Sequence, residues 1–251
     1  MTSLPRRASA DLAALLRSPL ALALAAALGA GAFALFSMFP REAHADTIAP
    51  EPVETAQVEL LTEQEKANFL KQYEALPKVT VPIDAGGAKV LVVKFNDYQC
   101  PPCRQSYMQY KWAIAKYEAL GQLKFVLKHF PLERECNAAV STDLHVASCE
   151  AAAAVVMAQS KGTADKLEEW LFANQPSLTP ERVKEGAATV GGITDFDAQY
   201  ARALTLVKTD AGLGALLGAK STPTFLVNGR VIAGALPPAY FELAIEHELK
   251  R

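Results

Sequence analysis

The sequence predicts an α/β fold in which strands and helices surround a helical insertion, preceded by one N-terminal membrane segment. Three observations predict this class. A strand, a helix and a strand occupy residues 88–130, helical patterns alone fill residues 144–217, and two short strands and a helix follow at 222–249. A crossover of about twenty residues between the first two of these strands implies a right-handed unit with a parallel strand pair.

Apolar periodicity defines each element in turn. The first helix, residues 61–76, begins with Thr62 as N-cap, and Glu65 completes a capping box. Asn228-Gly229 joins the last two strands in a turn typical of a type I′ hairpin. The other strands are expected at residues 78–82, 88–96 and 123–130, and the other helices at 104–120, 144–159, 164–173, 180–189, 196–217 and 238–249.

The start of the chain predicts export. Residues 19–39 carry no charge and are long enough to cross a hydrocarbon core of about 30 Å. The three arginines in residues 1–18 place that end in the cytoplasm. We therefore expect an inner-membrane anchor at 19–39, a tether at 40–60 and an extracytoplasmic domain on the periplasmic side at 61–251.

A cleaved secretory signal is the alternative for the same segment. Ala43-His44-Ala45 forms an A-x-A-like cleavage pattern before Asp46. Cleavage after Ala45 would leave a soluble periplasmic protein. Both interpretations export the domain.

Composition limits the class of partner. The 251 residues carry a net charge of −2 and are 51% hydrophobic, so the chain can build one well-filled domain of about 190 residues besides its leader. The chain has no excess of basic residues that would indicate nucleic acid binding.

The motif Cys100-Pro101-Pro102-Cys103 stands where the predicted strand gives way to a helix. At such a place the unpaired N–H groups and the positive end of the helix dipole favour a thiolate on the first cysteine. A free thiol titrates near about 8.5, and values of roughly 3.5 to 7.5 occur in this setting. Cys100 is therefore the expected nucleophile and Cys103 the resolving thiol.

Two other interpretations of the motif were weighed. A zinc site needs a second ligand pair at short range, and the four histidines form no ligand-spaced pair. An inert structural bridge fits the strand-to-helix position less well. We expect neither a metal nor a cofactor.

The second cysteine pair, Cys136 and Cys149, brackets a loop that leads into an alanine-rich helix. The short spacing of the first pair favours Cys100–Cys103 with Cys136–Cys149 among the three possible connectivities. The second pair is expected to be a structural disulfide. The alternative is a relay that passes electrons between the active site and a membrane partner.

With Thr222-Pro223 opening the terminal hairpin, the motif order resembles the DsbA-like family, which has a thioredoxin fold with a helical insertion, here about residues 137–218. The resemblance covers about residues 78–251. It implies that Pro223 is cis and packs beside the CxxC motif. It also implies that Thr222 offers backbone hydrogen bonds to an extended substrate chain.

Two further segments carry resemblances, and the second of them points to a partner. Residues 128–133, KHFPLE, look like a segment common among exported DsbA-like proteins. The cysteine-containing stretch after it is similar to thioredoxin-like domains that accompany bacterial homologues of vitamin K epoxide reductase. The resemblance therefore implies a membrane redox partner, either a DsbB-like or a vitamin K epoxide reductase-like quinone enzyme.

Lys94 departs from the family pattern. The family usually carries a buried acidic residue six positions before the first cysteine, where this chain has Lys94. A buried carboxylate relay is therefore in doubt. A charged lysine close to the thiols would favour thiolate, whereas a lysine that extends its ammonium to solvent would not.

These observations predict an exported thiol–disulfide oxidoreductase that donates disulfides to cysteine-containing exported proteins. The main alternative is a disulfide reductase or isomerase, for example in cytochrome c maturation. A non-catalytic chaperone or copper-binding domain is the alternative from another class, since soft thiolates select Cu(I).

Overall fold

The computed structural model describes residues 61–251. The predicted n-region, anchor and tether, residues 1–60, lie outside the described residues. Among residues 61–251, no helix is both long enough and apolar enough to cross a membrane.

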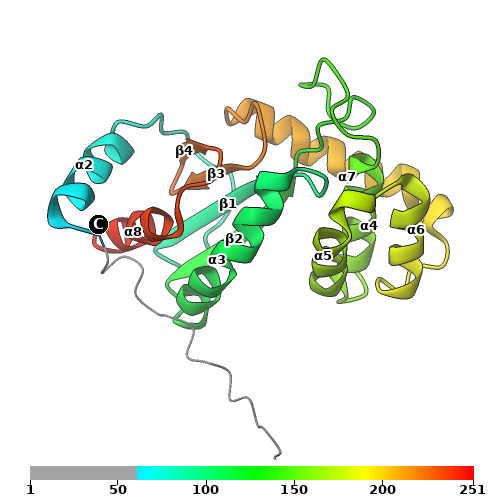
Figure 1. The fold of residues 1–251 in the computed structure, drawn as a ribbon, viewed down its shortest axis with the longest axis horizontal. Coiled ribbons are helices and arrows are strands. Elements are labelled where there is room, and N and C mark those ends of the chain that lie inside the picture. Colours follow the sequence, from blue (N-terminus) through cyan, green and yellow to red (C-terminus); the bar gives the residue numbers. More distant parts are fainter. Residues whose placement is uncertain (1–60) are drawn as a thin grey trace, which may run out of the picture. The chain divides into compact units, whose positions relative to one another are not determined.

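A four-stranded sheet in the order β2-β1-β3-β4 forms the centre (Figure 1). The strands are β1 (Val90–Asn96), β2 (Leu123–His129), β3 (Thr224–Val227) and β4 (Arg230–Ala233). As predicted, β1 and β2 are parallel, and β3 and β4 form an antiparallel hairpin. β1 also pairs antiparallel with β3, which places the hairpin beside the strand that leads to the CxxC motif.

The hairpin turn follows the sequence prediction. Asn228 and Gly229 both have positive φ angles, 46° and 84°, as a type I′ turn requires. The prediction of a strand at residues 78–82 is wrong. Only Lys78 pairs there, in an isolated bridge to Arg230, while the N–H of Val79 is bonded to the carbonyl of Gly229 in the turn.

Helices cover both faces of the sheet. On one face α3 (Pro101–Ala119) and α8 (Pro238–Leu249) bury Tyr110 and Phe241 against Val92 and Phe225. On the other face α7 (Phe196–Leu216) packs against Phe95. Helix α2 (Glu63–Glu74), which comes before β1 in the chain, has the predicted capping box of Thr62 and Glu65.

The helical insertion contains α4 (Ser148–Gln159), α5 (Ala164–Ala173) and α6 (Pro180–Thr189), followed by α7. Figure 1 shows these helices gathered beyond the N-terminal end of α3. Their apolar core includes Cys100 and Cys103. The insertion therefore supplies part of the surroundings of both thiols.

One helix is shorter than predicted. The helix expected from residue 144 begins at Ser148. The Gln99 side chain accepts hydrogen bonds from the N–H groups of Val146 (3.1 Å) and Ala147 (2.7 Å). These bonds tie the loop to the active-site turn.

Candidate active site

Cys100 lies at the junction that the sequence predicted. β1 ends at Asn96 and Cys100 is the N-cap of α3, so the first helical positions are the two prolines. The N–H of Cys103 donates to the carbonyl of Cys100 at 3.0 Å, which closes the first turn. Both cysteines are free thiols, with Cys100 4% exposed and Cys103 fully buried.

The Cys100 thiol is poised to ionise. A hydrogen bond from Cys103 is the largest cause that lowers the pKa of Cys100, to about 6, and the Thr222 side chain adds to it, while burial opposes both. When protonated, the Cys100 thiol donates a hydrogen bond to the carbonyl oxygen of Thr222 at 3.2 Å. The Thr222 hydroxyl is buried and has no hydrogen-bond partner among residues 61–251, so it can donate to the thiolate.

The Cys103 thiol, in contrast, tends to stay protonated. Burial raises the pKa of the Cys103 thiol well above its ordinary value, and the neighbouring Cys100 adds to this effect. The N–H of Asp97 approaches the Cys103 sulfur at 3.5 Å. When the environments of two titratable groups move their pKa values apart, the groups are suited to different roles. Cys100 is suited to attack and Cys103 to resolution.

Lys94 does not extend to solvent. It is 2% exposed, and its Nζ donates to the carbonyl oxygen of Cys103 at 3.1 Å. Burial lowers the pKa of Lys94, while Cys103, Glu168 and Cys100 raise it in that order. This position agrees with the sequence-based alternative in which the lysine lies close to the thiols, and not with the one in which its ammonium reaches solvent.

Thr222 and Pro223 lie next to the thiols. The Thr222-Pro223 peptide bond is cis, and β3 starts at the next residue. The carbonyl contact with Cys100 joins positions that are 122 residues apart in the chain.

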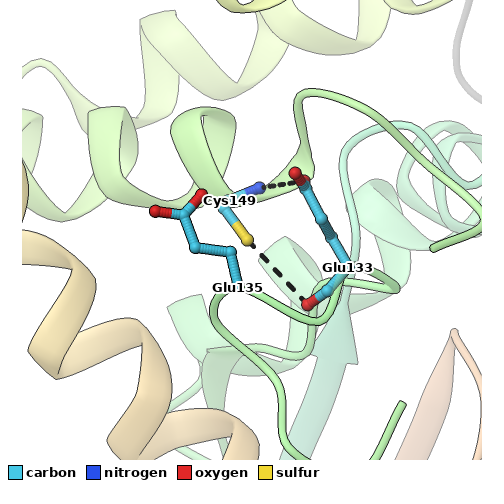
Figure 2. A group of neighbouring side chains, drawn as sticks. All are labelled: Glu133, Glu135 and Cys149. Carbon is cyan, nitrogen blue, oxygen red and sulfur yellow. Dashed lines mark hydrogen bonds between the residues drawn. The ribbon is translucent and has the colours of Figure 1, made fainter. Parts of the chain in front are cut away.

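Cys136 and Cys149 are bonded to each other, with Cα atoms 5.8 Å apart. Glu133 holds the second cysteine: its Oε2 accepts from the N–H of Cys149 at 3.0 Å, and its carbonyl oxygen lies 3.9 Å from the Cys149 sulfur (Figure 2). Glu135 completes a group whose ligand-type atoms lie within 4.8 Å of one another. Because the sulfur is already in a disulfide, this group does not offer a thiolate to a metal.

Asp97 is a buried residue of the site that the sequence analysis missed. Its carboxylate is buried and accepts from the N–H of Leu132 (2.6 Å) and the hydroxyl of Ser148 (2.7 Å), and it pairs with His145 Nδ1 (2.8 Å). It also accepts from the N–H of Gln99 at 2.7 Å. The only local signal was its place in the turn between strand and motif, which does not reveal these distant donors.

Gln175 and Glu168 were also missed. The Gln175 side chain donates to the carbonyls of Tyr98 (2.7 Å) and Cys100 (3.1 Å), so it fixes the backbone before the helix. Glu168 on α5 accepts from the Tyr98 hydroxyl at 3.3 Å. Both come from the insertion, about seventy residues after the motif, and no spacing rule relates them to it.

Comparisons with known proteins agree with this geometry. A model of the thioredoxin family matches residues 83–247. Among curated proteins, the Na(+)/H(+) antiporter NhaA 1 of Mycobacterium sp. (strain KMS) is 29% identical over 164 residues. That match covers 63% of this chain and 25% of the antiporter. The chain thus spans about a quarter of the curated relative's length.

Two solved structures have similar folds. A periplasmic thioredoxin-like protein from Salmonella enterica serovar Typhimurium has a TM-score of 0.51 at 22% identity, covering 76% of this chain and 99% of that chain. The alpha-DsbA1 protein of Wolbachia pipientis has a TM-score of 0.55 at 17% identity, covering 71% and 96%. At these identities the likeness concerns the fold.

Proposed function

The chain belongs to the thioredoxin family, and we propose that this thiol–disulfide oxidoreductase donates a Cys100–Cys103 disulfide to cysteines of exported proteins. The observation that carries the proposal is the opposite ionisation of the two thiols. The pKa of Cys100 is lowered to about 6, whereas that of Cys103 is raised. A stabilised Cys100 thiolate favours the reduced protein, which makes its disulfide a better oxidant.

Electrons move from the substrate to the enzyme in this reaction. A substrate thiolate attacks the Cys100 sulfur, the Cys100–Cys103 bond breaks, and Cys103 leaves as a thiolate that takes up a proton. The second substrate thiolate then attacks the substrate sulfur of the mixed disulfide, and Cys100 leaves as a thiolate. The substrate is oxidised to a disulfide and the enzyme is reduced to the dithiol.

Thr222 and Pro223 are the proposed substrate shelf, because they border Cys100 at the start of β3. The resemblance supports a quinone-linked membrane enzyme as the partner that reoxidises the dithiol. Residues 19–39 would keep the domain at the periplasmic face of the inner membrane. Mass measurement of the mature N-terminus tests this part, since cleavage after Ala45 would remove the anchor.

The reduction potential tests the direction of electron flow. The protein is equilibrated with glutathione buffers of known ratio, and the fraction of dithiol is measured after acid quenching and thiol labelling. A potential near about −120 mV supports the disulfide donor, and one near about −270 mV supports the reductase alternative. The isomerase alternative is tested by adding a protein with scrambled disulfides.

Cys100→Ala separates redox turnover from binding. The variant should lose peptide oxidation and insulin reduction, because the thiol that remains in the motif, Cys103, is buried and has a raised pKa. Undiminished activity in these assays would contradict the proposed function. Binding of Cu(I) by the wild-type protein without turnover would instead support the carrier alternative.

A further inference from the structure

In the part of the chain that the structure describes, the buried Lys94 side chain has no hydrogen-bonded carboxylate. Its Nζ donates to the Cys103 carbonyl at 3.1 Å and lies 5.5 Å from the centre of the Phe172 ring and 5.9 Å from that of Phe225. Removing an ammonium from water costs several kcal/mol unless an anion compensates. A negative charge close to Lys94 would therefore stabilise its charged form.

When Cys100 is bonded to a substrate sulfur, two groups can supply that negative charge, and they lie on different elements. Cys103 and Glu168 are the two largest influences that favour the charged form of Lys94. Cys103 is on α3 and Glu168 is on α5 of the insertion. A cavity of about 80 Å³ has both Lys94 and Glu168 in its wall, and a space of that size can hold water between polar groups.

The Cys103 proton needs a route out of the protein. Cys103 is fully buried, so bulk water cannot take the proton of its thiol directly. Ser106 lines the same cavity, and its hydroxyl donates to the Cys103 carbonyl at 2.9 Å. The cavity thus has Glu168 and Ser106, one helical turn after the resolving cysteine, in the same wall.

We propose that Glu168 accepts the proton of Cys103 when the Cys100–Cys103 disulfide closes, while Lys94 stays an ammonium and pairs with whichever group is ionised. This inference rests on the proposed function. Before the transfer Glu168 is the anion, and after it Cys103 is the anion. The net charge of the buried group does not change, so no unpaired charge is created in the interior.

The step balances as follows. In a mixed disulfide at Cys100, the Cys103 thiol gives its proton to the Glu168 carboxylate and becomes a thiolate. That thiolate attacks the Cys100 sulfur, the Cys100–substrate bond breaks, and the substrate sulfur leaves as a thiolate. The enzyme dithiol is oxidised and the substrate disulfide is reduced, and disulfide donation follows the same path in reverse.

The surroundings adjust Glu168 to this role. Burial raises the pKa of Glu168 to about 7, while Lys94 and the Tyr98 hydrogen bond oppose it. A base of this pKa is half ionised near neutral pH and can both accept and release a proton there. The other titratable or charged groups around the cavity and Glu168 are Tyr107, Tyr110 and Lys111 on α3 and Asp165 on α5.

Release of a coloured thiol, when Cys103 displaces it from a mixed disulfide at Cys100, tests the proposal. The reduced protein reacts with 5,5′-dithiobis(2-nitrobenzoate), and release of the second nitrothiobenzoate reports attack by Cys103. The wild-type rate should rise with pH and level off above about pH 7, when Glu168 is ionised. Glu168→Gln should slow closure about tenfold or more at neutral pH and remove the levelling.

Glu169→Gln is the matched control, since Glu169 is the exposed neighbour of Glu168 on the same helix. It should keep the wild-type rate and pH profile. Circular dichroism and urea unfolding check that Glu168→Gln is folded. A folded Glu168→Gln protein with the wild-type rate and levelling would overturn the proposal.

Lys94→Met provides a second test that does not depend on Glu168→Gln. An apolar side chain suits the apolar walls of this site, so the variant should fold. It should raise the pKa of Cys103, measured by thiolate absorbance in a Cys100→Ala background, because a stabilising cation is lost. An unchanged Cys103 pKa would overturn the role of Lys94.

The assay separates this inference from the proposed function. If the wild-type protein forms the mixed disulfide but never releases the second thiol, the oxidoreductase function itself fails. If the wild type closes and Glu168→Gln closes in the same way, only the proton transfer fails.

Discussion

Lowering the pH from 7 to 5 should remove a contribution of about 1.3 kcal/mol to the stability of the reduced protein, and Cys100 should be the cause. The folded pKa of Cys100 is about 6, against about 8.5 for an unfolded cysteine. A group whose pKa is lowered by folding stabilises the fold fully above its unfolded pKa. That stabilisation is lost as the pH falls through the folded pKa.

The magnitude follows from the two pKa values. At pH 7 about nine-tenths of folded Cys100 is thiolate but only about 3% of the unfolded residue is, which gives about 1.4 kcal/mol in favour of folding. At pH 5 the contribution falls to about 0.1 kcal/mol. For a two-electron couple, 1.4 kcal/mol also makes the disulfide more oxidising by about 30 mV at pH 7.

Urea unfolding of the reduced protein at pH 5, 6, 7 and 8 measures this effect, with a phosphine reductant present throughout. Cys100→Ser is the control, because it keeps every other titrating group. The difference in unfolding free energy between wild type and control should grow by about 1.3 kcal/mol from pH 5 to pH 7. If the two proteins have the same pH dependence, the Cys100 thiolate is not stabilised and the reasoning is refuted.

Three further predictions concern the scaffold. Replacing Cys136 and Cys149 together by serine should lower the unfolding free energy by roughly 3 kcal/mol and retain insulin reduction; loss of turnover with an intact fold would favour the relay. Asp97→Ala should cost about 3 kcal/mol or more in urea unfolding, since it leaves buried donors unpaired, and a change under 1 kcal/mol would contradict that role. Gly229→Ala should cost about 1–3 kcal/mol, because a Cβ would lie 2.1 Å from the Val79 carbonyl oxygen at a φ of 84°; an unchanged melting temperature would count against it.

Local pattern predicted most elements well. The helices at 164–173, 180–189 and 238–249 have the bounds expected from periodicity. Two predictions were wrong for the same reason: contacts with other parts of the chain override the local sequence pattern. Residues 78–82 have strand-like composition but lie at the edge of the hairpin, where only Lys78 pairs. Residues 144–147 have a helical pattern, but Gln99 holds them in a loop through hydrogen bonds to Val146 and Ala147.

The sequence by itself determined the reactive motif and its setting. A β-branched strand followed by Cys100, two prolines and Cys103 defines a helix N-terminus wherever it occurs, because this is a matter of local backbone chemistry. The hairpin with Asn228-Gly229 was determined in the same local way.

Only the tertiary structure decided which charges surround the thiols. Whether Lys94 is buried depends on the packing of α3 and the insertion around β1, and the cavity that has Lys94 and Glu168 in its wall joins residues 74 positions apart. Periodicity shows which face of an element is apolar but not which distant side chain it meets. The electrostatic surroundings that separate Cys100 from Cys103 are therefore a property of the fold.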